Sequence, residues 1–184
     1  MQRFDEATAE EKRALELDPF SLVINHALGF SYVFARRYDE AIQQYRKTIE
    51  LDQNWYLGHW YLGFVYELKG LHPEALAEFQ KARELNDDPY VLAYLGHAYA
   101  ASGKRDEAMK ILGQMNDVAG RRYVSAYSFA VIYAGLGDKD HAFEWLERSY
   151  RDRAWDITYL KVDPVFDNLH TDPRFADLVR RVGL

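Results

Sequence analysis

The chain has 184 residues, of which 48% are apolar and 28% are charged, and its formal net charge at pH 7 is −6. This composition is typical of a folded domain and excludes a wholly disordered chain. The acidic balance disfavours nonspecific binding to nucleic acid or to anionic membranes, and because the chain has no cysteine, disulfides, thiolate metal sites and cysteine nucleophiles are excluded.

Residues 1–19 contain half of a pattern that recurs later in the chain. Ala7, Glu11 and Ala14 follow the spacing i, i+4, i+7, which places side chains on one face of a helix. No partner helix precedes them, so the segment predicts an orphan helix that lacks its usual neighbour. Two explanations stay open: the chain is a fragment of a longer protein, or a symmetric copy covers the bare side.

Residues 20–152 carry four copies of a two-helix pattern that recurs every 33 or 34 residues. The first helix of each copy, helix A, carries a Leu-Gly-x-x-Tyr type segment. The second, helix B, carries Ala-x-x-x-aromatic-x-x-small. Small residues in one helix leave room for rings of the other, so each copy predicts a helical hairpin. In the turns inside the last two copies, Asp106 and Asp138 are predicted N-caps. The helix A segments are Leu28-Gly29-x-x-Tyr32, Leu62-Gly63-x-x-Tyr66, Leu95-Gly96-x-x-Tyr99 and Phe129-Ala130-x-x-Tyr133, and the helix B segments begin at Ala41, Ala75, Ala108 and Ala142.

These segments resemble the tetratricopeptide repeat (TPR) family, whose pattern is Trp-x2-Leu-Gly-x2-Tyr, then Ala-x3-Phe, then Pro. The resemblance covers about residues 3–152. The chain departs from the pattern at its first position, which holds Asn25, His59, Leu92 and Ala126 in place of Trp. The resemblance implies an all-α fold, a right-handed α-α superhelix of the TPR solenoid type, and a non-catalytic scaffold that binds proteins.

Residues 153–184 follow a different pattern and predict a C-terminal cap within the same single domain. Asp163-Pro164 and Asp172-Pro173 each read as an N-cap followed by a first-turn proline. An apolar stripe after the second pair predicts a short helix that covers the last repeat. The tail also resembles the end of TPR arrays in bacterial signalling proteins, which follow winged-helix activators, adenylate cyclases or serine/threonine kinases. The stripe consists of Phe175, Leu178, Val179 and Val182.

The helix A positions next to the motif residues are expected to line a concave groove. Trp60 and Phe64 lie one turn apart at its centre, and the two histidines in the set suggest a pH dependence near neutrality. Aromatic anchors of this kind favour binding of a peptide or of a partner helix, although simple packing of the rings between helices remains the alternative. The predicted groove residues are His26, Phe30, Trp60, Phe64, Glu67, His97 and Tyr127.

No sequence motif for catalysis, metal binding or phosphate binding stands out, so we expect neither enzymatic activity nor a cofactor. The leading interpretation is a scaffold whose partner is a protein or peptide, with no nucleic acid and no membrane. The alternative is a regulatory or self-association module cut from a larger bacterial signalling or transcription protein, which would form a homo-oligomer through the N-terminal half repeat. With no signal peptide visible, the expected compartment is the cytoplasm, or the periplasm if an upstream membrane segment is missing.

Overall fold

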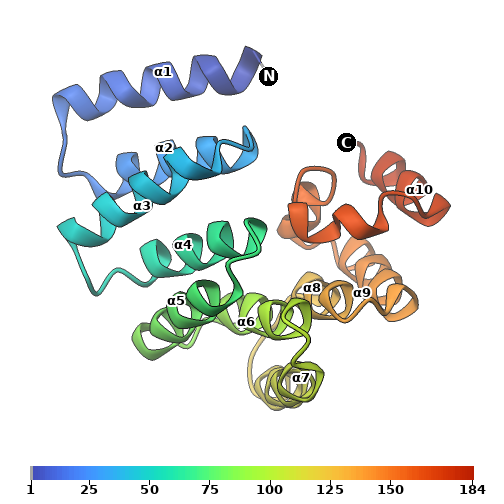
Figure 1. Cartoon of the computed structure of the whole chain (residues 1–184). Helices are drawn as coiled ribbons and strands as arrows, with labels where there is room; N and C mark the ends of the chain where they lie inside the picture. The colour runs from blue at the N-terminus through green and yellow to red at the C-terminus, as the bar shows by residue number, and fades with distance from the viewer. Residues whose placement is uncertain (1) are drawn as a thin grey trace. The chain divides into compact units, whose positions relative to one another are not determined.

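A computed structural model of the chain describes residues 2–184 and shows a series of antiparallel helices (Figure 1). No strand occurs within those residues, so the predicted all-α helical-repeat fold is confirmed. Residue 1 and the Phe4 side chain, both in the predicted orphan helix, lie outside what is described. The elements are α1 (Gln2–Leu17), α2 (Leu22–Phe34), α3 (Tyr38–Leu51), α4 (Tyr56–Leu68), α5 (His72–Leu85), α6 (Pro89–Ala101), α7 (Arg105–Ala119), α8 (Ala126–Gly135), α9 (Lys139–Arg151), the 3-10 helices η1 (Trp155–Tyr159) and η2 (Pro164–Leu169), and α10 (Pro173–Val182).

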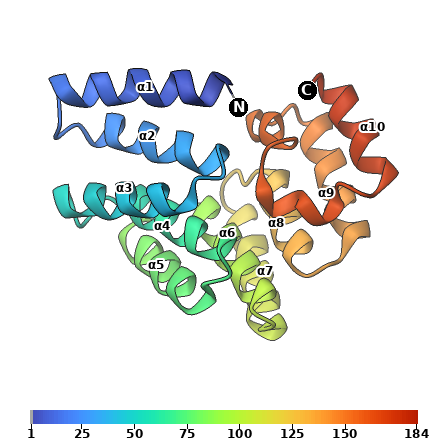
Figure 2. The ribbon, with the colours of Figure 1, turned by 45° about the horizontal axis from the view of Figure 1, so that its top comes forward.

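The chain divides into two compact units, Met1–Asp87 with α1 to α5 and Asp88–Leu184 with α6 to α10. In unit 1, each helix packs against the next one along the chain, and α1 lies along α2 in both views (Figures 1 and 2). The Gly29 position explains the close approach of α2 and α3, because a Cβ added there would lie 2.7 Å from Cζ of Tyr45. Tyr45 is fully buried, as the alternation of small residues and rings predicts.

The turns inside the hairpins repeat with the same period as the helices. A residue with positive φ stands at the same place in every hairpin, namely Arg36, Gly70, Gly103 and Gly137. The predicted N-cap Asp138 is confirmed, since its carboxylate accepts a hydrogen bond from the backbone of His141. The predicted N-cap Asp106 is wrong: the N-cap is Lys104, two residues earlier, and Asp106 lies inside the first turn of α7.

A polar clasp closes the first hairpin at the motif position where Trp is usual in the family pattern. The Asn25 side chain donates to the backbone oxygens of Pro19, at 3.1 Å, and Ser21, at 2.9 Å. Its own oxygen accepts from Gln44 of α3 at 2.7 Å. The clasp therefore ties the α1–α2 turn, α2 and α3 together with buried, satisfied polar groups.

The second hairpin has an equivalent clasp 34 residues later, in which a histidine and a glutamate replace the two amides. His59 Nδ1 lies 2.6 Å from the carboxylate of Glu78 on α5, and Nε2 lies 3.0 Å from the backbone oxygen of Gln53. Both partners are acceptors, so a proton on either ring nitrogen has a partner to bond. In unit 2 the equivalent positions are apolar or aromatic, with Leu92 and Ile111 in one hairpin and Ala126 and Trp145 in the other.

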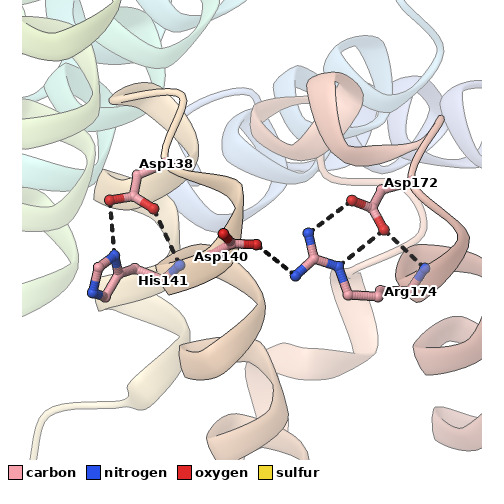
Figure 3. Close-up of polar contacts among 5 residues, drawn as sticks. All are labelled: Asp138, Asp140, His141, Asp172 and Arg174. Carbon is pink, nitrogen blue, oxygen red and sulfur yellow. Dashed lines mark hydrogen bonds and ion pairs between the residues drawn. The ribbon is translucent and has the colours of Figure 1, made fainter.

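In unit 2, α6 pairs with α7 and α8, α8 pairs with α9, and α10 lies against α9 (Figure 2). The predicted N-caps Asp163 and Asp172 are confirmed, because their side chains accept from the backbone of Val165 and Arg174. Figure 3 shows how Arg174 joins the helices: its guanidinium forms two hydrogen bonds with Asp172, at 3.0 and 2.8 Å, and one with Asp140 of α9, at 2.8 Å.

Two cation–π contacts complete the packing of α10 on α9. The Arg174 guanidinium lies 4.3 Å from the Phe143 ring centroid, and that of Arg181 lies 4.7 Å from the Tyr150 ring centroid. Arg181 also forms a bidentate pair with Glu147 of α9, at 2.7 and 2.8 Å. The helix predicted to cap the last repeat is thus held to it by arginine side chains together with its apolar stripe.

Candidate partner-binding surfaces

In unit 1, rings from α2, α4 and the turn before α4 form an aromatic cluster around His26. The His26 ring centroid lies 4.6 Å from that of Tyr61 and 5.6 Å from that of Trp55. Phe30 and Phe34 extend the cluster along α2, with their ring centroids 4.5 Å apart. All members of the cluster are half-buried. The aromatic cluster consists of His26, Phe30, Phe34, Trp55 and Tyr61.

Burial lowers the pKa of the His26 imidazole to about 4, so the ring is neutral at physiological pH. The Tyr45 hydroxyl lies 3.5 Å from Nδ1 of His26, and burial raises the pKa of that tyrosine well above its usual value. The expectation that His26 gives a pH dependence near neutrality is therefore wrong. A desolvated ring surrounded by other rings titrates in acid instead.

The structure places the other predicted residues of unit 1 deeper than expected. Trp60 and Phe64 stack with their rings at an interplanar angle of 9°, and they are only 7% and 3% exposed. Glu67, one turn further along α4, is also buried. Trp60 was expected to be exposed in a groove; instead it is a packing residue behind the half-buried ring of Tyr61, which lies 4.2 Å away between centroids.

In unit 2, the chain's own tail covers the corresponding surface of helices α6 and α8. The predicted groove residue Tyr127 is 1% exposed and meets the ring of Phe166 edge-on at 5.1 Å. Its hydroxyl donates to Asp163 at 2.8 Å, and the hydroxyl of Tyr94 donates to the same carboxylate oxygen at 2.9 Å. One carboxylate from the tail is thus held by tyrosines from two different helices.

A second tyrosine–aspartate pair holds the start of the tail. The Tyr90 hydroxyl donates to Asp156 at 2.8 Å, and the Tyr90 ring stacks on Trp155 at 5.9 Å. Further along, the Asn168 side chain donates to the backbone oxygen of Ala134 in α8 at 2.8 Å. The segment from η1 to η2, which is folded into two 3-10 helices, therefore covers the helix A surface of unit 2 through rings and hydroxyls.

The electrostatics of this contact follow from burial. Desolvation raises the pKa of Asp163, and the hydrogen bonds from Tyr127 and Tyr94 oppose that rise. Burial likewise raises the pKa of Tyr127. The Asp163 carboxylate accepts three hydrogen bonds, from Tyr94, Tyr127 and the backbone of Val165, and these offset the cost of burying it in the interior.

The last predicted residue, His97, is half-buried on α6 and packs over Gly135 of α8. A Cβ added at Gly135 would lie 2.8 Å from Cδ2 of His97, so only glycine permits this approach. The sequence prediction did not include Tyr90, Tyr94, Asp156 or Asp163 among the site residues. Asp163 was recognised only as an N-cap, since its tyrosine partners stand 36 and 69 residues away.

Two further observations bear on function. In the part of the chain that the structure describes, no group of three or more His, Asp and Glu side chains could hold a metal ion. A search of the same residues for a helix long and apolar enough to cross a bilayer finds none.

The stacked hairpins define a helical-repeat protein, and comparisons with known proteins specify the kind of repeat. A family model described as "Tetratricopeptide repeat" matches residues 23–54, which contain nearly all of the α2–α3 hairpin. No curated protein matches the chain.

Solved structures extend the likeness over nearly the whole chain. TTC0263, a thermophilic TPR protein from Thermus thermophilus, has a TM-score of 0.67 at 19% identity, with 97% of this chain and 92% of that chain covered. MamA has a TM-score of 0.59 at 22% identity, covering 85% and 92%. YrrB, described as a TPR protein with an unusual peptide-binding site, has a TM-score of 0.55 at 15% identity, covering 94% and 90%. At these identities the likeness shows the fold alone, and the match to the tetratricopeptide repeat model is confined to residues 23–54.

Proposed function

We propose that the chain is a non-catalytic scaffold that binds a peptide or a helix of a partner protein on the helix A surface of unit 1. TPR proteins generally mediate protein–protein interactions, and the fold is typically a scaffold without catalysis. The proposal places the partner on the surface formed by the aromatic cluster, with Trp60, Phe64 and Glu67 packed beneath or beside it.

The observation that carries the proposal is the contact between the tail and unit 2. Tyr127 stands at the same repeat position as His26 and Trp60, and in unit 2 this position contacts the 3-10 helix η2 and its N-cap Asp163. The helix A side chains of this protein thus form a surface that accepts an irregular segment through rings and hydroxyls. Repeat equivalence favours the same use of His26 and its neighbours in unit 1.

The test is to select binding peptides from a random peptide display library and to measure their affinity for Phe30→Ala and His26→Ala. Loss of a hot-spot ring typically costs about 2 kcal/mol, which is roughly 30-fold in Kd. His141→Ala on α9, an exposed histidine of unit 2, is the matched control. Selected peptides that bind both cluster variants and the control equally, with unchanged melting temperatures, would remove the proposal.

The alternative is a self-association or regulatory module that uses the N-terminal half repeat. The solvent-facing side chains of α1 are mostly charged, and α1 packs on α2 through its other side. No observation on α1 favours a second copy there, and self-association through this helix stays a prediction that light scattering can test.

A further inference from the structure

Three large apolar side chains are exposed within seven residues: one at the end of α1, one in the turn that follows and one in the first turn of α2. Leu17 is 90% exposed, Phe20 76% and Val23 73%. We call Leu17, Phe20 and Val23 the N-terminal patch. Isolated exposed apolar residues are ordinary on protein surfaces, whereas a contiguous group is the usual mark of an interaction site.

The backbone that carries the N-terminal patch is held rigidly. The Asn25 side chain binds the carbonyls of Pro19 and Ser21 on either side of Phe20, and the Ser21 hydroxyl caps α2 by accepting from the backbone of Ile24. The Phe20 ring is thus presented from a fixed turn. Binding to a preorganised surface costs less conformational entropy than binding to a mobile loop.

The next repeat provides an internal comparison, because the same turn recurs 34 residues later. There the counterparts of Leu17 and Val23 are Leu51 and Leu57, which are both half-buried. The counterpart of Phe20 is Asn54, which is exposed and polar. The turn itself therefore does not require an apolar side chain at the position of Phe20, and packing within the repeat does not account for the exposed ring.

The charges next to Leu17 along the chain are negative. Glu16 and Asp18 flank Leu17 and are exposed, and the last turn of α1 contains no basic residue. The carbonyl end of a helix adds partial negative charge at the same place. The nearest cation along α1, Arg13, is paired with Glu10 at 2.7 Å.

Apolar side chains at the C-terminal end of a helix, flanked by carboxylates, match a partner with an apolar stripe bordered by lysine or arginine. We propose that the N-terminal patch is a docking site for a basic amphipathic helix of another protein. The proposal rests on the scaffold function proposed above and names a further surface for it. Three side chains expose a few hundred Å² at most, well short of the roughly 800 Å² per partner of a stable interface, so a single helix fits the patch better than a second copy of the chain.

The experiment uses a fluorescent 18-residue peptide of Leu and Lys with a leucine stripe, and a matched peptide in which every Lys is Glu. We expect the basic peptide to bind and the acidic one to bind at least ten-fold more weakly. The patch variant Leu17→Ser/Phe20→Ser should weaken the basic peptide ten-fold or more with little change in melting temperature, because both side chains are exposed. Glu16→Lys/Asp18→Lys should also weaken it. The matched control is Tyr123→Ser, which removes a ring that is 72% exposed in unit 2.

Several results would overturn the docking site. They are equal binding of the two peptides, equal binding by the patch and control variants, or light scattering that shows a dimer abolished by Leu17→Ser/Phe20→Ser, which would assign the patch to a second copy. The scaffold function is judged separately. If Phe30→Ala weakens the display-selected peptides while the patch variant leaves the basic peptide unaffected, the scaffold stands and the docking site falls.

Discussion

Exchanging the His59–Glu78 clasp of the second hairpin for the amide clasp of the first should cost unit 1 little stability, whereas changing one partner alone should cost more. His59 bonds to Glu78 and to the Gln53 carbonyl. In the preceding repeat, Asn25 bonds to Gln44 and to the Pro19 carbonyl in the same places. His59→Asn alone places a carboxamide oxygen against the Glu78 carboxylate. In the double variant His59→Asn/Glu78→Gln, the new glutamine amide can donate a hydrogen bond to the new asparagine oxygen, as Gln44 does to Asn25 in the first hairpin.

The magnitudes follow from the burial of the pair. A hydrogen bond to a charged group contributes about 1.5–3 kcal/mol, and a buried group left unsatisfied costs a similar amount. His59 is buried but Glu78 is only half-buried, so the carboxylate can turn partly to water. We expect His59→Asn to lower the free energy of unfolding by about 2 kcal/mol. The double variant should lower it by about 1 kcal/mol, because the volume of the imidazole ring is still lost. The coupling between the two sites should therefore be about 1 kcal/mol or more.

The assay is native-state hydrogen exchange of the α4 and α5 amides at pH 7, supported by urea unfolding. Exchange reports the opening of a local segment, which suits a repeat protein whose units need not unfold together. His141→Asn, an exposed histidine with an Asp138 partner, should change stability by less than about 0.5 kcal/mol. A double variant as unstable as the sum of the two single variants would refute the clasp, since additivity means that the side chains do not interact.

Three further changes have defined outcomes. Tyr127→Phe should destabilise unit 2 by about 1.5–3 kcal/mol in urea unfolding, because it removes a donor to a buried carboxylate, whereas the exposed Tyr123→Phe should have no effect. Glu11→Gln should raise the melting temperature at pH 7 but not at pH 3: burial raises the pKa of Glu11, so its ionised form opposes folding above its usual pKa. Hydrogen bonds from Arg174 lower the pKa of Asp172 to about 2, so their contribution to α10 protection in hydrogen exchange should persist at pH 5 and decline as the pH falls from 4 towards 2. Arg174→Ala should remove that decline.

The sequence was sufficient to predict the repeat because very small residues and large aromatic residues recur in it at a fixed period. Gly29 and Tyr45 can only be adjacent if α2 and α3 form a hairpin, and the spacing of such pairs specifies the helices. Local capping was also predictable at Asp138, since an N-cap bond spans three residues. Asp106 failed as a cap because the N-cap stands four residues before the helix B alanine in every hairpin, and that position is Lys104 in α7.

The candidate site was less predictable, because it depends on where a non-periodic segment lies. Tyr127 occupies the same repeat position as His26, yet it is sealed by Phe166, and no periodic signal reveals that the tail folds onto α8. The exposure of Trp60 was predicted from ring type alone, which does not distinguish an interface anchor from a packing residue. The clasps leave a signal in the sequence, because polar residues occupy both positions in each of the first two hairpins: Asn25 with Gln44, and His59 with Glu78. That signal is visible only when the two positions are compared together across repeats.

The two clasps also bear on how the chain avoids folding errors. Similar hairpins in tandem can pair across repeats, and such mispairing is a characteristic failure of repeat proteins. If α2 paired with α5, the oxygen of Asn25 would face the Glu78 carboxylate, because its amide nitrogen is already committed to the Pro19 and Ser21 carbonyls. If either polar helix B of unit 1 met a helix A of unit 2, Gln44 or Glu78 would lie against Leu92 or Ala126 and lose its partner. The pair of side chains at the first motif position thus differs from hairpin to hairpin. We expect these differences to favour pairing of each helix A with the helix B of its own repeat during folding.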